Sequence, residues 1–311
     1  MATIQSSAKR AMPPVVRRWS RRAAALVAGV AVLAGAAWTL RTEAVQAPGR
    51  FVQARPLNIA HGGAQGRAPA NTMPAFEQAV ELGADALELD VQLSADGHAV
   101  VFHDDTVDRA TDGTGRVGDL ALSELKALDA GYHWTDEDGN TPYRGRGVTI
   151  PTLAQVLAAF PHQPVIAELK AAADPAVARE VANVLAARDR RDDVLVASFD
   201  EGLLNRFRAL APKVPTSLAE DEVRTFYTLH LAGLHRWWRP PGVALQASEH
   251  YEGRHVVDRR FVDAADDLGL QVHVWTVNER SAMRRMIELG VEGIITDYPG
   301  RLADELDDPG A

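Results

Sequence analysis

Residues 86–102 read Ala-Leu-Glu-Leu-Asp-Val-Gln-Leu-Ser-Ala-Asp-Gly-His-Ala-Val-Val-Phe, and this stretch decides the fold. Two apolar runs, 86–92 and 99–102, are joined by only six residues, 93–98. A crossover between parallel strands needs about a dozen residues, so these two runs are not consecutive parallel strands. Asp96-Gly97 in the connection is a pair typical of a tight turn. We therefore expect the run 99–102 to pair antiparallel with the run 86–92.

The rest of the chain from residue 57 alternates short apolar runs with amphipathic stretches, which is typical of parallel βα units. The predicted strands are 57–60, 86–92, 99–102, 165–169, 194–197, 215–219, 243–247, 272–275 and 293–296. The predicted helices are 73–82, 153–160, 175–187, 201–210, 258–268 and 279–289. Without the antiparallel run, eight parallel strands remain. The sequence thus predicts an α/β fold, a (β/α)8 TIM barrel with an insertion after the second strand at about 93–149, on the face where barrel active sites lie.

The first 47 residues differ from the rest in charge and hydropathy. Six of their seven basic residues precede 23–40, a run of eighteen uncharged and mostly apolar residues. A helix of that length spans about 27 Å, close to the hydrocarbon thickness of a bilayer. We predict that 1–47 is a signal peptide or an N-terminal membrane anchor and that 48–311 is the barrel domain. The protein would then be exported, to a periplasmic or other extracytoplasmic site, and would contact a membrane through this segment.

Composition excludes several kinds of site and partner. The chain has a net charge of −9, and removing the +6 of residues 1–47 leaves −15 on the barrel domain. So acidic a domain is a poor nucleic-acid binder, because phosphate backbones require a basic face. An anionic small molecule remains compatible if a metal ion supplies local positive charge. The absence of Cys excludes disulfides, iron–sulfur clusters and zinc–thiolate sites.

Carboxylates recur with a period of two on two predicted strands. Glu88 and Asp90 share one face of the second strand, and Glu168 and Lys170 share one face of the next parallel strand. Three carboxylates inside a barrel are costly unless a cation compensates them. Oxygen-only ligands suit Mg²⁺ or Ca²⁺ better than zinc. The alternative is an ion pair between the carboxylates and Lys170.

Two histidines stand at strand ends on the same rim. His61 directly follows the first strand, and His103 ends the antiparallel run. Imidazoles beside a metal-bound phosphate suit acid–base catalysis near neutral pH. Trp275 is a candidate wall of the substrate pocket, although a core aromatic is the simpler interpretation. Other polar candidates at this rim are Ser198, Gln246, Thr296 and Asp297.

Taken together, these residues resemble the glycerophosphodiester phosphodiesterase family. The resemblance extends from about residue 58 to residue 302, and its order of motifs is more specific than any one of them. The segments that carry it are Ala60-His61-Gly62-Gly63, Pro69-Ala70-Asn71-Thr72, Leu87-Glu88-Leu89-Asp90-Val91, Val101-Phe102-His103-Asp104, Ile150-Pro151-Thr152-Leu153, Glu168-Leu169-Lys170, Val272-His273-Val274-Trp275-Thr276-Val277-Asn278 and Gly293-Ile294-Ile295-Thr296-Asp297.

The resemblance implies a barrel with an insertion after its second strand, which the spacing at 93–98 predicts independently. It implies a divalent cation, Mg²⁺ or Ca²⁺, held by Glu88, Asp90 and Glu168. It also implies that His61 and His103 are the acid–base pair. In that family a hydroxyl of the substrate's glycerol can attack phosphorus and give a cyclic phosphate, which water then hydrolyses.

Two positions depart from the family pattern. Gly62 stands where the family usually has Arg, and Ala70 where it usually has Glu. The resemblance implies that Lys170 binds the phosphate of the substrate. Because the usual Arg would also contact phosphate, we expect Arg67 or Lys170 to take over that contact.

The predicted function is metal-dependent hydrolysis of glycerophosphodiesters to glycerol phosphate and an alcohol. One alternative is a lysophospholipase D, which cleaves the same bond in a lysophospholipid that retains an acyl chain. A long apolar channel would favour that substrate, whereas a small polar pocket would favour deacylated ones. An alternative of another class is a non-catalytic binding module of the cell envelope.

Overall fold

The computed structural model describes residue 47 and the ranges 49–170, 174–251 and 253–307. These residues belong to one compact unit, which runs from Val45 to Ala311. Of the predicted export segment, 1–47, residues 1–46 lie outside the described residues. Within the ranges that are described, no helix has the length and apolar character needed to cross a membrane.

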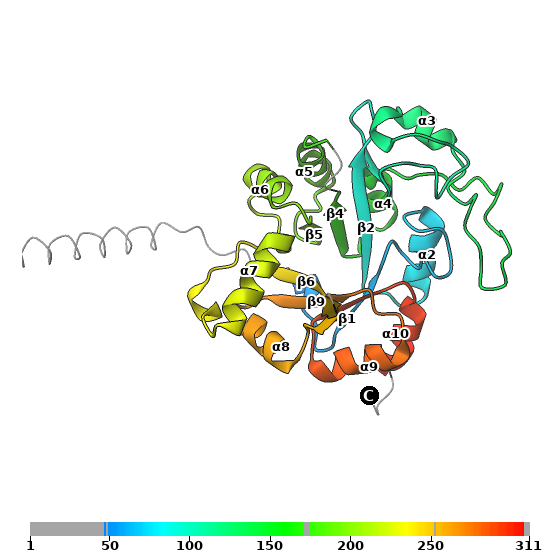
Figure 1. The fold of residues 1–311 in the computed structure, drawn as a ribbon. Helices are drawn as coiled ribbons and strands as arrows, with labels where there is room; N and C mark the ends of the chain where they lie inside the picture. Colours follow the sequence, from blue (N-terminus) through cyan, green and yellow to red (C-terminus); the bar gives the residue numbers. More distant parts are fainter. Residues whose placement is uncertain (1–46, 48, 171–173, 252, 308–311) are drawn as a thin grey trace, which may run out of the picture. The chain divides into compact units, whose positions relative to one another are not determined.

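Seven parallel strands form the wall of the barrel (Figure 1). Neighbouring strands pair in the order β5-β4-β2-β1-β10-β9-β6, and every neighbouring pair is parallel. Their bounds are β5 (Val194–Ala197), β4 (Val165–Leu169), β2 (Ala86–Leu93), β1 (Leu57–Ala60), β10 (Gly293–Thr296), β9 (Gln271–Trp275) and β6 (Ala244–Ser248). Each of these strands was predicted to within one residue at either end.

The eighth predicted strand, 215–219, does not form a continuous strand. Isolated parallel bridges instead join Val196 to Thr216 and Ser217 to Ala244. The Ser217 amide donates to the Val196 carbonyl at 2.9 Å, and the Leu218 amide donates to the Ala244 carbonyl at 2.7 Å. The segment therefore joins β5 to β6 and completes the barrel, although Pro215 cannot donate a ladder hydrogen bond at its start. The predicted barrel is confirmed, and only the extent of this strand was wrong.

The run after the tight turn is antiparallel, as the six-residue connection predicts. Strand β3 (Ala99–Val101) pairs with β2 so that Val91 lies opposite Val101, and it lies off the barrel path. The insertion continues with the 3-10 helix η2 (Val117–Asp119) and helix α3 (Leu122–Ala127). Its own small core includes Val100, Phe102, Val107, Val117, Leu125 and Ile150.

Helices surround the strands on the outside (Figure 1). They are α2 (Met73–Glu81), α4 (Leu153–Ala159), α5 (Val177–Arg188), α6 (Glu201–Leu210), α7 (Glu220–Leu231), α8 (Arg259–Asp266), α9 (Arg280–Leu289) and α10 (Pro299–Asp307). Short elements complete the order: the 3-10 helices η1 (Gly49–Phe51) and η3 (His235–Trp237), and the hairpin strands β7 (His250–Tyr251) and β8 (Arg254–His255). Helices α7 and α10 were not predicted.

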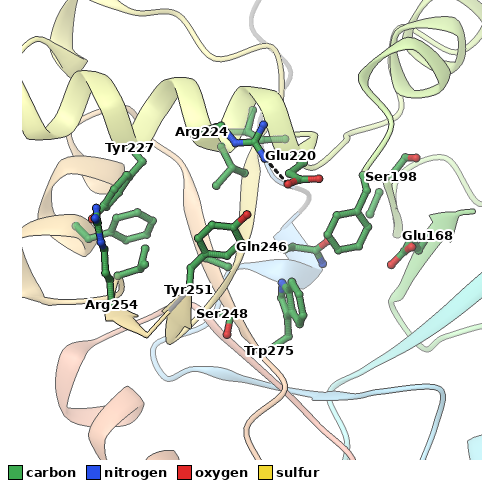
Figure 2. A pocket seen from close by; sticks show the side chains of 17 residues that line it. Glu168, Ser198, Glu220, Arg224, Tyr227, Gln246, Ser248, Tyr251, Arg254 and Trp275 are labelled. Carbon is green, nitrogen blue, oxygen red and sulfur yellow. Dashed lines mark hydrogen bonds and ion pairs between the residues drawn. The ribbon is translucent and has the colours of Figure 1, made fainter. Parts of the chain in front are cut away.

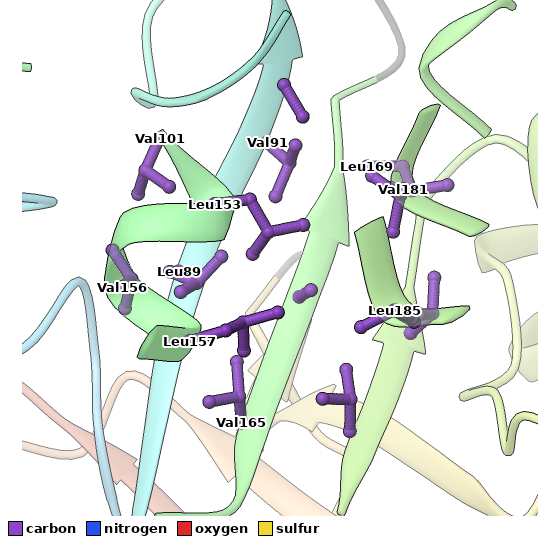
Figure 3. Close-up of a cluster of buried hydrophobic side chains, with 14 of the residues drawn as sticks. Leu89, Val91, Val101, Leu153, Val156, Leu157, Val165, Leu169, Val181 and Leu185 are labelled. Atoms are coloured by element: carbon purple, nitrogen blue, oxygen red, sulfur yellow. The ribbon is translucent and has the colours of Figure 1, made fainter. Parts of the chain in front are cut away.

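Alternation along the strands divides the side chains between two environments. Leu89 and Val91 of β2 point outward and pack against α4 and α5. Leu153 and Leu157 are among the α4 side chains in this cluster (Figure 3). A second cluster of apolar side chains lies inside the barrel. It includes Leu57, Ile59, Ala86, Ile166, Leu195 and Ile295. The side chains between Leu87, Leu89 and Val91 are Glu88 and Asp90, which consequently enter the barrel interior.

Candidate active site

The three predicted metal ligands come together inside the barrel. Asp90 on β2 lies opposite Glu168 on β4 in the parallel register, and Glu88 precedes Asp90 by two residues on the same face. One carboxylate oxygen from each residue lies within 4.8 Å of those of the other two. Glu88 and Asp90 are buried, with exposed fractions of 5% and 3%. The spacing thus places three acidic groups at one point that a single cation can reach.

Crowding destabilises the negative charge of this cluster. Burial and the charge of Asp90 raise the pKa of Glu88 to about 8, and the same two causes raise the pKa of Glu168. Polar neighbours hold the carboxylates in place: the Gly62 amide donates to Glu88 Oε2 at 2.9 Å, and Asn71 Nδ2 donates to Asp90 Oδ2 at 2.8 Å. A group of three carboxylates that repel each other, two of them buried and Glu168 partly buried, has the donor set of a hard divalent cation.

Lys170 reaches the same cluster. Its Nζ lies 3.2 Å from Asp90 Oδ1 and 2.9 Å from Glu168 Oε1. The ion pair considered from the sequence is therefore formed in this structure. The Lys170 ammonium donates hydrogen bonds to Asp90 and Glu168 but not to Glu88. Lys170 therefore compensates only part of the negative charge of the cluster.

His61 is held by a carboxylate from β10's carboxyl end. Its Nδ1 lies 2.7 Å from Asp297 Oδ1. Burial lowers the pKa of His61, but the hydrogen bond to Asp297 and the charges of Glu88 and Asp90 outweigh burial and raise the pKa to about 9. The imidazole therefore favours its protonated form at neutral pH.

His103 has a similar hydrogen-bonding arrangement. Its Nδ1 lies 2.7 Å from Asp104 Oδ1, and Arg109 fixes that carboxylate through Nε at 2.5 Å from Oδ2 and Nη2 at 2.9 Å from Oδ1. About half of the His103 side chain is exposed. In both histidines a carboxylate occupies Nδ1, which leaves Nε2 as the nitrogen that can exchange a proton with a substrate.

Two cavities adjoin the carboxylate cluster. The first, the polar cavity, measures about 370 Å³ and is lined by both histidines, Asp90 and Arg109, along with other polar groups of the insertion. The second, the apolar cavity, measures about 340 Å³ and begins at Glu168 (Figure 2). Trp275, predicted as a pocket wall, lines the apolar cavity, where its ring meets Phe199 edge to face at 5.8 Å.

These geometric features agree with an independent comparison of sequences. The model of the Glycerophosphoryl diester phosphodiesterase family matches residues 61–301. The chain belongs to the glycerophosphoryl diester phosphodiesterase family. The barrel fold and the enzymatic class predicted from the sequence are thereby confirmed, and the non-catalytic module is not supported.

Relatives and a solved structure cover most of the chain. A glycerophosphodiester phosphodiesterase of Caldanaerobacter subterraneus subsp. tengcongensis is 32% identical over 252 residues, covering 80% of this chain and 96% of the relative. The human lysophospholipase D GDPD1 is 26% identical over 274 residues, covering 80% and 85%. An Oleispira antarctica phosphodiesterase, solved with its product sn-glycerol-3-phosphate, is 27% identical with a TM-score of 0.68, covering 82% and 98%.

The two departures from the family pattern lie at one place in the structure. Gly62 and Ala70 both line the polar cavity, and a Cβ on Gly62 would lie 3.2 Å from the Cβ of Ala70. Gly62 has a φ of 55°, a conformation that side chains other than glycine's rarely adopt. Arg67 is exposed and lines neither cavity, so the structure does not bring it to the other predicted site residues.

Sequence reasoning missed two residues that hold the site together. Arg109 fixes Asp104 from five residues away in an irregular loop, a spacing that carries no periodic signal. Asn71 has a φ of 61° and contacts Asp90 through both polar atoms of its side-chain amide: Nδ2 donates to Asp90 Oδ2, and Oδ1 accepts from the Asp90 backbone amide. An Asn-Thr pair directly before a helix is typical of a helix cap, yet the Thr72 side chain forms no cap hydrogen bond at the start of α2.

A second group with metal-binding residue types, Glu249, His250 and His255, lies on the β7–β8 hairpin. Both oxygens of Glu249 accept hydrogen bonds from Arg285, at 2.9 and 3.1 Å from Nη2. The ion pair with Arg285 therefore compensates the charge of Glu249. This group is separate from the cluster of Glu88, Asp90 and Glu168.

Proposed function

We propose that the protein hydrolyses glycerophosphodiesters to glycerol phosphate and an alcohol, with a divalent cation, Mg²⁺ or Ca²⁺, held by Glu88, Asp90 and Glu168. The observation that carries this proposal is the convergence of three carboxylates, two buried and one partly buried, within 4.8 Å at the edge of a cavity lined by two histidines. When bound, the cation would supply positive charge that draws electron density from the non-bridging phosphate oxygens.

The two histidines act as the acid–base pair. His61, kept in its protonated form by Asp297, is the better proton donor and protonates the leaving alkoxide. His103, more exposed and oriented by Asp104, accepts the proton of the attacking oxygen. In the first step that oxygen is a hydroxyl of the substrate's own glycerol, and the alcohol leaves with the proton from His61. The roles then reverse when water opens the cyclic phosphate: His61, now neutral, accepts the proton of water, and His103, now protonated, returns its proton to the glycerol oxygen.

Lys170 holds the phosphate beside the cluster. Its ammonium already lies within hydrogen-bonding distance of two of the proposed ligands, so an anionic phosphate at the cluster comes within its reach. Gly62 and Ala70 carry no charge, and Arg67 lines neither cavity. Besides His61, the basic side chains that we assign to the anionic phosphate are therefore Lys170 at the cluster and Arg109 in the wall of the polar cavity.

The direct assay measures release of glycerol phosphate from glycerophosphocholine by the full-length protein in Mg²⁺, in Ca²⁺ and in chelator. We expect turnover with one or both cations and none in chelator. Restoration of activity on adding the cation back separates metal loss from unfolding. Equal turnover in chelator would refute the metal assignment.

Alanine variants test the histidines. We expect His61→Ala and His103→Ala each to lower kcat by roughly 100- to 10,000-fold, the usual contribution of a general acid or base. Circular dichroism checks that both remain folded. His162→Ala is the matched control, because His162 is exposed in the loop before β4 and lines neither cavity. Wild-type kcat in either site variant would remove that histidine from the mechanism.

We also propose that residues 1–47 deliver the barrel domain outside the cytoplasm, because a basic stretch precedes a bilayer-length apolar run there. A reporter that is active only after export, fused behind residues 1–47, should be active in cells, and the same fusion without 23–40 should be inactive. An inactive reporter in the first fusion would contradict export.

A further inference from the structure

The carboxylate cluster lies between two cavities of different chemistry. Asp90 lines the polar cavity, Glu168 lines the apolar cavity, and the oxygens of these two residues belong to one group within 4.8 Å. Phosphorus in a phosphodiester is tetrahedral, so its two ester arms leave in different directions. A phosphodiester whose phosphate lies at the cluster can therefore extend one arm into each cavity.

The walls of the polar cavity suit a hydroxylated or charged arm. Imidazole, amide, guanidinium and hydroxyl groups line it, from His103, His133, Gln65, Arg109 and Thr135. Small ligands are oriented by such convergent polar groups. Apolar side chains such as Phe102 and Trp134 also line it, so its wall is mixed in character.

The apolar cavity has the opposite character. Its wall is formed by Ala197, Phe199, Leu218, Val223, Tyr227, Ala247, Val256, Phe261 and Trp275. Figure 2 shows it extending from Glu168 and Ser198 at one end to Tyr227 and Arg254 at the other, with Trp275 and Tyr251 between them. A volume of about 340 Å³ lies within the range of small-molecule pockets.

The charges in the apolar cavity disfavour a cationic occupant. Arg224 and Arg254 line it, and the Arg224 guanidinium already pairs with Glu220 at 2.6 Å. Glu220 is thereby neutralised, and Arg254 at the far end would repel a quaternary ammonium. Aromatic walls alone would admit such a group, but the charge of Arg254 disfavours it and the aliphatic side chains favour an uncharged hydrocarbon.

We propose that the apolar cavity binds a single hydrocarbon chain carried by one ester arm, so that the substrate class is phosphodiesters that retain one acyl or alkyl chain, such as lysophospholipids. This inference rests on the proposed phosphodiesterase function and adds to it a subsite that begins at Glu168. The chain lies along Trp275 and Phe199 and ends among the side chains of α7 and the β7–β8 hairpin, while the head group occupies the polar cavity.

The test compares glycerophosphocholine with lysophosphatidylcholines of increasing acyl length, each below its micelle concentration, on the full-length protein. Choline release serves as the common readout. We expect kcat/KM to rise by up to about fourfold per methylene, since each buried methylene contributes about 0.8 kcal/mol and 1.36 kcal/mol is tenfold. The rise should stop once the chain fills the cavity.

Matched variants of α7 locate the subsite. Val223→Trp fills the cavity from its wall, whereas Thr225→Trp places the same side chain on an exposed position of the same helix that does not line it. We expect Val223→Trp to keep glycerophosphocholine turnover and to lose at least tenfold of the gain from chain length. Thr225→Trp should behave as the unchanged protein.

Binding of dodecylphosphocholine, measured by titration calorimetry, separates the two proposals, because it does not depend on turnover. Binding that Val223→Trp abolishes and Thr225→Trp retains would support the subsite even if no substrate were hydrolysed, and in that case only the proposed function would fail. Equal kcat/KM for all chain lengths, or a chain-length gain that survives Val223→Trp, would overturn the subsite alone. Loss of glycerophosphocholine turnover in Val223→Trp would indicate a choline pocket and would also overturn it.

Discussion

A carboxylate at Nδ1 leaves Nε2 of each proposed catalytic imidazole, His61 and His103, free to face the substrate. Asp297 does this for His61, and Asn278 Nδ2 in turn donates to Asp297 Oδ2 at 2.7 Å. Asp104 does it for His103. The period-two spacing predicted the carboxylate cluster because strand pleating alone sets it. Asp297 was predicted only as a polar candidate at the rim, and Asp104 only as part of a motif. Their hydrogen bonds to the histidines could not be predicted in the same way, because the conformation of the loops that carry them is not encoded in a local pattern.

Replacing Asp297 should move the pH profile in one direction. The Asp297 hydrogen bond raises the pKa of His61, and the protonated form is the proton donor, so activity falls as pH rises through that pKa. Asp297→Asn removes the negative charge, lowers the pKa and should shift the alkaline limb of kcat/KM to lower pH in saturating cation. Asp104→Asn is the matched control at the other histidine. An unmoved alkaline limb in Asp297→Asn, or an equal shift in both variants, would contradict the assignment of the donor.

Among the elements, β9 illustrates what the sequence reveals and what it leaves hidden. The strand itself was predicted, but the burial of the His273 side chain inside the barrel was not. Its ring is fully buried in the barrel interior, and neither ring nitrogen has a hydrogen-bond partner among the described residues. Gly293 on β10 makes room for it, because a Cβ there would lie 2.7 Å from His273 Cδ2. Burial lowers the pKa of His273 to about 4.

His273 should make folding stability depend on pH. Its pKa is about 4 when folded and about 6.5 when unfolded, so the unfolded chain gains the proton first. Its contribution is complete above pH 6.5 and declines as pH falls, by about 2 kcal/mol between pH 8 and pH 5. In denaturant titrations, His273→Leu should lose about 2 kcal/mol less than wild type over this range, whereas His162→Leu should not differ. Parallel pH dependence in His273→Leu and wild type would exclude this role.

The elements that sequence reasoning missed have weak local signals. Helix α7 carries Thr225, Phe226, Tyr227 and Thr228 in succession, and β-branched and aromatic residues lower helix propensity. Helix α10 begins with Pro299-Gly300, a pair that also indicates a turn. The segment 215–219 has the composition of a strand but forms only bridges. In each case packing against the barrel, rather than local preference, decides the conformation.

At the scale of the whole molecule, barrel closure brings together residues that are far apart in sequence. His61 and Asp297 are separated by 236 positions yet share a hydrogen bond. The alternation of strands and helices predicted that closure, and with it the common rim. The division of that rim into a polar and an apolar cavity was not predictable, because it depends on how α7, the β7–β8 hairpin and the insertion pack around it.

The central claim is that Glu88, Asp90 and Glu168 together bind one divalent cation, and calorimetric titration of Mg²⁺ and Ca²⁺ into the full-length protein tests it most directly. We predict one ion per chain for at least one of the two cations. Binding at this site should disappear in the triple variant Glu88→Gln, Asp90→Asn, Glu168→Gln and persist in Glu201→Gln, which changes an exposed carboxylate of α6. An unchanged stoichiometry and affinity in the triple variant, or no binding of either ion to the wild-type protein, would contradict the account.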